Sequence, residues 1–78
     1  MLKYLIIEDD TVFRTRLVDA LQKRGNLAWG ANCLADAEQL LAQQQVDRCV
    51  VDLRIGSESG MDALRMLRQR NPQTRALM

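Results

Sequence analysis

Acidic residues occur at two places in this chain where solubility alone does not explain them. Glu8, Asp9 and Asp10 directly follow the apolar run LII, and Asp52 lies within the apolar stretch CVVDL. Such branched apolar runs are typical of buried strands in a parallel sheet, and the acids stand where those strands would end. Two carboxylates about 4 Å apart repel by roughly 4 kcal/mol at an effective dielectric constant near 20, so acids gathered there need a cation or protons. Mg²⁺, which binds carboxylate oxygens, water and phosphate, would meet that need.

A simpler explanation exists for part of this pattern. Acids at the start of a helix cap its free N–H groups and favour its positive end, and Glu8, Asp9 and Asp10 could do only that. For Asp10 we expect capping alone. Asp52 is a stronger functional candidate, because an acid inside an apolar strand has few structural uses.

The composition excludes several classes of site. The chain has 78 residues, a net charge of +1 and no histidine, so it contains no histidine base, Ser-His-Asp triad or imidazole metal ligand. Dinucleotide binding would need a glycine-rich turn after the first strand, where the acids stand, and EDD does not supply the DxD pattern of small metal-dependent phosphatases. Cys33 and Cys49 lack the spacing of metal ligands, and we expect both to be buried as small apolar residues. We expect a cytoplasmic protein, because the N-terminus meets an acid too soon for a signal peptide and nothing suggests a disulfide-forming compartment. We expect no membrane partner, since no apolar run approaches the roughly 18 residues of a spanning helix.

The elements that must position these acids alternate along the chain. Strands are predicted at 2–7, 27–31 and 48–53, helices at 34–44 and 61–70, a loop at 56–60 and the beginning of another strand at 74–78. The first helix is expected to be capped by Thr11, to end at Gly25 and Asn26, and to bury one face. That face is expected to comprise Val12, Phe13, Leu17, Ala20 and Leu21. Strands alternating with helices predict one α/β domain with a parallel sheet and helices on both faces.

These residues together resemble the receiver domain of two-component response regulators. The resemblance covers essentially the whole chain and rests on the acids of LIIEDD, the aspartate of VVDLRI and Gly60, eight residues beyond Asp52. It implies a flavodoxin-like doubly wound sheet with strand order 2-1-3 and a stub of strand four. It also implies that Asp52 accepts a phosphoryl group from a sensor histidine kinase. Mg²⁺ would then be held by Glu8, Asp9, Asp52 and the backbone carbonyl of Arg54, with Glu8 acting through water.

The resemblance further implies an organisation for the protein. Residues 1–78 would be the N-terminal part of a receiver domain, ending within strand four, with the effector domain absent. The stretch VVDLRIGSESGMDALRMLR is most similar to regulators of the RegA and PrrA type, which carry a Fis-like helix-turn-helix domain. The implied function is a phosphorylated switch that controls transcription and is not an enzyme, with DNA contacted only through that other domain.

A different class of function stays open at this point. The chain could be a protein interaction module that is not phosphorylated and forms a homodimer through an unpaired edge of strand three or the strand-four stub. Titration with a divalent metal separates the two hypotheses, because only the first needs a metal site.

Overall fold

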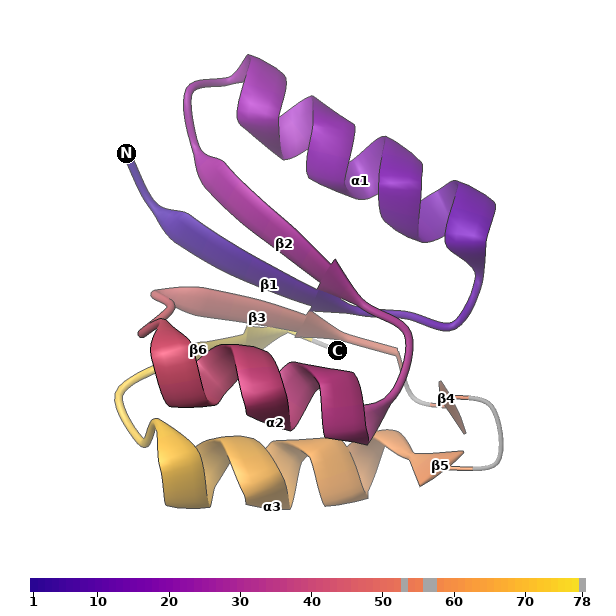
Figure 1. Cartoon of the computed structure of the whole chain (residues 1–78), viewed down its shortest axis with the longest axis vertical. Coiled ribbons are helices and arrows are strands. Elements are labelled where there is room, and N and C mark those ends of the chain that lie inside the picture. Colours follow the sequence, from indigo (N-terminus) through magenta and orange to yellow (C-terminus); the bar gives the residue numbers. More distant parts are fainter. Residues whose placement is uncertain (53, 56–57, 78) are drawn as a thin grey trace.

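The computed structural model describes residues 1–52, 54–55 and 58–77. Figure 1 shows a sheet whose strands run between helices. The strands are β1 (Lys3–Ile7), β2 (Leu27–Ala31), β3 (Arg48–Val51), β4 (Arg54–Ile55), β5 (Glu58–Ser59) and β6 (Arg75–Leu77). The helices are α1 (Thr11–Lys23), α2 (Leu34–Gln43) and α3 (Gly60–Arg70). The predicted alternation of strands and helices is therefore confirmed.

The main sheet is parallel and has the strand order β2-β1-β3-β6. This confirms the expected order 2-1-3 and the stub of a further strand. The stub pairs with β3 itself, in the register Cys49 with Ala76. Strand three therefore lies inside the sheet, and the prediction that it has an unpaired edge is wrong. Thr74 fixes this arrangement, because its buried hydroxyl donates to the Val46 carbonyl at 2.7 Å.

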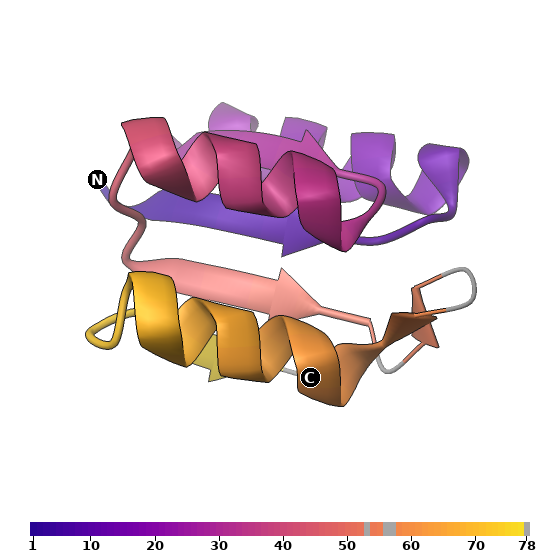
Figure 2. The same cartoon turned by 60° about the horizontal axis from the view of Figure 1, so that its bottom comes forward.

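Helices cover both faces of the sheet, as predicted. Figure 2 shows α2 and α3 in front of the sheet and α1 behind it. The main core lies between the sheet and the α2–α3 layer and consists of alternate strand residues and the inner positions of both helices. Its members are Leu5, Ile7, Ala31, Ala37, Leu41, Val46, Cys49, Val51, Ala63 and Leu67. Cys49 is buried, as predicted, and its burial raises the pKa of the thiol to about 12. Cys33 is only partly buried.

Helix α1 turns a different face to the sheet than its apolar residues predict. Its partly buried positions are Arg14, Leu17, Val18 and Leu21, which form one stripe at helical spacing. Val12 and Phe13 are 61% and 55% exposed, and Ala20 is exposed as well, so the predicted buried face is wrong at these positions. The physical reason is that α1 packs against β1 and β2, and the direction of that contact selects the stripe.

The ends of α1 show how local chemistry delimits a helix. Asp10 is the N-cap, as expected for this acid, because its carboxylate accepts the Phe13 N–H at 3.0 Å, and the prediction that Thr11 caps the helix is wrong. At the other end Gly25 adopts φ +87°, where it closes the helix as predicted. The Gly25 N–H donates to the Gln22 carbonyl and the Asn26 N–H to the Leu21 carbonyl, which is the Schellman arrangement.

The described part of the connection from β3 to α3 differs from the expected loop at 56–60. Its described part contains β4 and β5, which pair antiparallel, and α3 already begins at Gly60 with Ser59 as its N-cap. Leu53, Gly56 and Ser57, which belong to the predicted strand end and loop, lie outside the described residues. Among the residues that the structure describes, no helix is both long and apolar enough to cross a membrane.

Candidate metal centre

The sheet brings the first acidic run and Asp52 to the same edge. β1 and β3 are parallel and pair Ile7 with Val51, so the residues that follow, Glu8 and Asp52, are neighbours across the two strands. The Glu8 N–H donates to the Ala31 carbonyl at 2.9 Å, and the Asp52 N–H donates to the Ile7 carbonyl at 3.1 Å. Both acids are therefore held by hydrogen bonds that continue the sheet beyond its last strand residues.

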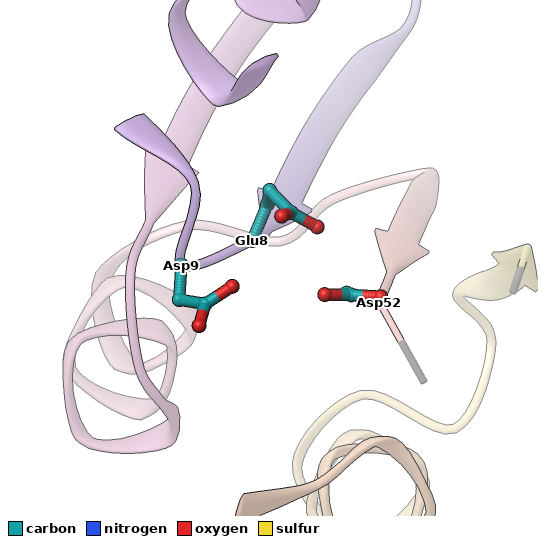
Figure 3. Close-up of side chains that lie close together, drawn as sticks. All are labelled: Glu8, Asp9 and Asp52. Atoms are coloured by element: carbon teal, nitrogen blue, oxygen red, sulfur yellow. The ribbon is translucent and has the colours of Figure 1, made fainter. Parts of the chain in front are cut away.

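Three of the predicted site residues converge. Glu8, Asp9 and Asp52 each place one carboxylate oxygen within 4.8 Å of the others. In Figure 3 their carboxylates face a common space between the ends of β1 and β3. Glu8 and Asp52 are partly buried and Asp9 is exposed, so the group is open to a ligand from solvent.

The electrostatics of the cluster disfavour ionised Glu8. Desolvation is the largest cause that raises the pKa of the Glu8 carboxyl above its ordinary value of 4.5. A hydrogen bond with Asp52 and the negative charges of Asp52 and Asp9 raise it further. The Asp10 N–H, which donates to the Glu8 carboxylate at 3.2 Å, partly opposes these effects. The site therefore favours an added positive charge, whether a proton or a cation.

This donor set fits a hard divalent cation. Carboxylate oxygens are the ligands that Mg²⁺ and Ca²⁺ prefer, and a small number of them with open access suits Mg²⁺, which keeps several waters. A cation placed among the three oxygens would cancel the repulsion that raises the Glu8 pKa. The residues present are thus compatible with the metal site that the sequence predicted.

The remaining predicted residues separate into two cases. Asp10 does not belong to the cluster and caps α1, as expected. Arg54 lies at the start of β4, two residues beyond Asp52, and the role of its carbonyl as a ligand stays a prediction.

A cleft of about 290 Å³ adjoins the acids on the same side of the sheet as α1. Apolar side chains provide most of its wall, and two of the acids also line it. It is lined by Ile6, Ile7, Glu8, Phe13, Val50, Val51 and Asp52. Phe13, which the sequence assigned to the core, is instead a wall of this cleft.

One contact at the site was not predicted from the sequence. The guanidinium of Arg14 donates to the backbone carbonyl of Glu8 at 2.7 Å. The only sequence signal is an arginine on the first turn after the acids, and arginines on helix surfaces are too common for that to identify a contact.

Comparisons with known proteins agree with this geometry. A family model described as the response regulator receiver domain matches residues 4–78. The photosynthetic apparatus regulatory protein RegA of Cereibacter sphaeroides is 32% identical over 74 residues, which are 95% of this chain and 40% of RegA. The acid tolerance regulatory protein ActR of Sinorhizobium medicae is 34% identical over 74 residues, with 95% of this chain and 38% of ActR covered. The sequence-based resemblance to RegA-type regulators is thereby confirmed.

A solved structure shares the fold. It is a response regulator protein from Burkholderia pseudomallei with a phosphorylated aspartic acid, a calcium ion and citrate. It superposes with a TM-score of 0.91 at 28% identity and covers 97% of this chain and 45% of that one. The chain thus spans about two fifths of the length of these curated relatives and less than half of the solved protein.

Proposed function

The chain belongs to the response regulator receiver domain family, and from this we propose that it accepts a phosphoryl group on Asp52 in a Mg²⁺-dependent reaction. The observation that carries the proposal is the convergence of Glu8 and Asp9 on Asp52 at the edge of the sheet. The phosphorylated aspartic acid and calcium ion of the Burkholderia relative support it.

Glu8, Asp9, Asp52 and the Arg54 carbonyl would hold the metal. When bound, Mg²⁺ supplies positive charge that stabilises the oxygens of a transferring phosphoryl group. Glu8 and Asp9, which lie between the end of β1 and the start of α1, then act by holding that charge beside Asp52.

Asp52 is the proposed nucleophile. One of its carboxylate oxygens forms a bond to phosphorus, and the bond between phosphorus and a nitrogen of the donor phosphohistidine breaks. The electron pair of that bond returns to the imidazole, which is left neutral or takes a proton from solvent. The open edge of the sheet gives such a donor access from solvent, and no proton has to be removed from an ionised Asp52 before attack.

The proposed role is a switch and not an enzyme. A sensor histidine kinase is the proposed donor, and the cytoplasm is the proposed location. Transcriptional control would be exerted through a DNA-binding domain in a longer protein, of the Fis-like helix-turn-helix kind. Support for this output comes from relatives named as regulatory proteins, of which the chain matches only the receiver portion.

The direct test is labelling of the chain with acetyl phosphate in the presence of Mg²⁺, followed by mass spectrometry. We expect one base-labile phosphoryl group on Asp52, no label in Asp52→Asn and normal labelling in Asp10→Asn. Labelling should be slow, because neither lysine of this chain is placed to hold the oxygens of the phosphoryl group. Lys3 lies at the far end of β1, and Lys23 lies at the end of α1. A label that survives Asp52→Asn, or forms equally when Mg²⁺ is chelated, would contradict the proposal.

A further inference from the structure

An arginine occupies a position of α1 that faces the sheet. Arg14 belongs to the partly buried stripe with Leu17, Val18 and Leu21, where an apolar residue would be expected. The aliphatic part of an arginine can cover apolar surface while its guanidinium reaches a polar group. Arg14 does both, since its stem crosses β2 and its guanidinium reaches the end of β1.

Gly30 of β2 makes this path available. A Cβ atom at this position would lie 2.9 Å from Cδ, 3.0 Å from Cγ and 3.3 Å from Nε of Arg14. A Cβ at these distances would make the arginine side chain shift, so its observed course depends on glycine at this position. Room for a displaced side chain exists, because an open hollow of about 340 Å³ lies between α1 and β2 and is lined by Arg14 itself.

The far end of the side chain is bonded to the acidic turn, by which we mean residues 8–10. Nη1 of Arg14 donates to the Glu8 carbonyl at 2.7 Å, and Nη2 lies 3.5 Å from Oγ1 of Thr11. The short first contact is a charge-assisted hydrogen bond, which is stronger than one between neutral groups. It joins the side chain of α1 to the backbone between the first two metal ligands.

We propose that Arg14, seated over Gly30, is a positioning residue that holds the acidic turn so that Glu8 and Asp9 face Asp52. The inference rests on the metal site of the proposed function and adds to it the groups that shape the site before a cation binds. The turn needs such support, because the three carboxylates repel one another and would move apart in the metal-free protein. The Glu8 N–H already bonds the Ala31 carbonyl of β2, and Arg14 adds a hydrogen bond from a side chain of α1 to the Glu8 carbonyl.

The direction in which Mg²⁺ affinity changes distinguishes a positioning role of Arg14 from the effect of its charge. Arg14 carries a positive charge near the site, so loss of charge alone would strengthen the binding of a cation. Loss of positioning weakens it. Gly30→Ala shifts the arginine side chain but keeps its charge, whereas Arg14→Met removes the guanidinium and keeps an apolar side chain about as long as the arginine stem.

The experiment is a calorimetric titration of the 78-residue chain with MgCl₂, accompanied by thermal melts without metal. We expect the dissociation constant of Mg²⁺ to rise about fivefold in both Gly30→Ala and Arg14→Met, which corresponds to about 1 kcal/mol, the usual net contribution of one hydrogen bond. The double variant should bind no more weakly than Arg14→Met, because both changes remove the same contact. Arg16→Met removes a charge from an exposed position of the same helix and serves as the control, with unchanged or slightly tighter binding.

A variant of a metal ligand shows whether the metal site itself is wrong or only the role of Arg14. Asp9→Asn should abolish binding, and if it does not, the proposed site is wrong whatever Arg14 does. If Asp9→Asn abolishes binding while Arg14→Met binds Mg²⁺ as well as or better than the parent chain, the positioning role is refuted. A purely structural role would lower the melting temperature without metal and leave the dissociation constant of the folded protein unchanged, which also refutes the proposal.

Discussion

Replacing Asp52 by Asn should change the stability of the protein in opposite directions with and without Mg²⁺. The substitution keeps the shape of the side chain and removes its charge. In the metal-free protein it removes the repulsion of Asp52 with Glu8 and with Asp9, whose oxygens lie within 4.8 Å. With Mg²⁺ present it also removes a ligand, so the same change costs binding energy.

The magnitude follows from these distances. Two unit charges 4.8 Å apart repel by about 3.5 kcal/mol at an effective dielectric constant of 20 and by about 0.9 kcal/mol in water. The cluster is partly exposed, so the lower value is the better guide, and two removed pairs amount to about 1–2 kcal/mol. At about 4–8 °C per kcal/mol for a domain of this size, the melting temperature of the metal-free variant should rise by at least about 4 °C.

Mg²⁺ should make the parent chain more stable than the Asp52→Asn variant. At a concentration of 100 times its dissociation constant, a ligand that binds only the folded state stabilises it by about 2.7 kcal/mol. The parent chain should gain this amount and the Asp52→Asn variant little, so the parent becomes the more stable protein.

Thermal unfolding monitored by circular dichroism, with EDTA and then with saturating MgCl₂, measures both effects. Asp10→Asn is the matched control, because asparagine is an equally good N-cap and Asp10 is not in the cluster. Mg²⁺ should therefore not change whether this variant is more or less stable than the parent. If Asp52→Asn is less stable than the parent without metal, or if Mg²⁺ stabilises both equally, the assignment of Asp52 to a repulsive metal-binding cluster is refuted.

Three further predictions concern the same edge of the sheet and the strand beside it. Calorimetry should show that Asp9→Asn abolishes Mg²⁺ binding while Asp10→Asn leaves it nearly unchanged, and equal losses would indicate a diffuse acidic patch. The raised pKa of Glu8 means that the folded state holds its proton more tightly than the unfolded chain does, so the stability of the metal-free protein should fall as the pH rises from below 4.5 through the folded-state pKa. Glu8→Gln should flatten that part of the pH profile of denaturant unfolding, and an unchanged slope would assign it to another group. No described strand pairs with the outer side of β6, where Leu77 is 50% exposed, so sedimentation should show self-association of this chain that Leu77→Lys weakens, and a monomer at every concentration would contradict this.

The sequence by itself determined the class of fold and the place of the acids. Apolar runs at 2–7, 27–31 and 48–53 are separated by predicted helices. This alternation predicts a parallel sheet and leaves few possible topologies. Because parallel strands end at the same edge, Glu8, Asp9 and Asp52 could be predicted to meet without knowledge of any side-chain position. Local signals such as Gly25 were equally sufficient, because the left-handed backbone at a helix end depends on one residue and its neighbours.

Only the tertiary structure decided which face each element presents and what lies opposite it. The apolar residues of α1 favoured a face with Val12 and Phe13, yet the helix turns Arg14 toward β2, because its orientation is set by where it packs on the sheet. Strand three was predicted to have an unpaired edge, but the stub at 75–77 pairs with it, because Thr74 and the turn before it bring this segment back to β3. The fit of Arg14 over Gly30 joins residues 16 positions apart through a space that exists only once both elements are in place. Contacts of this kind depend on distances between layers, which the pattern of residue types along a chain does not contain.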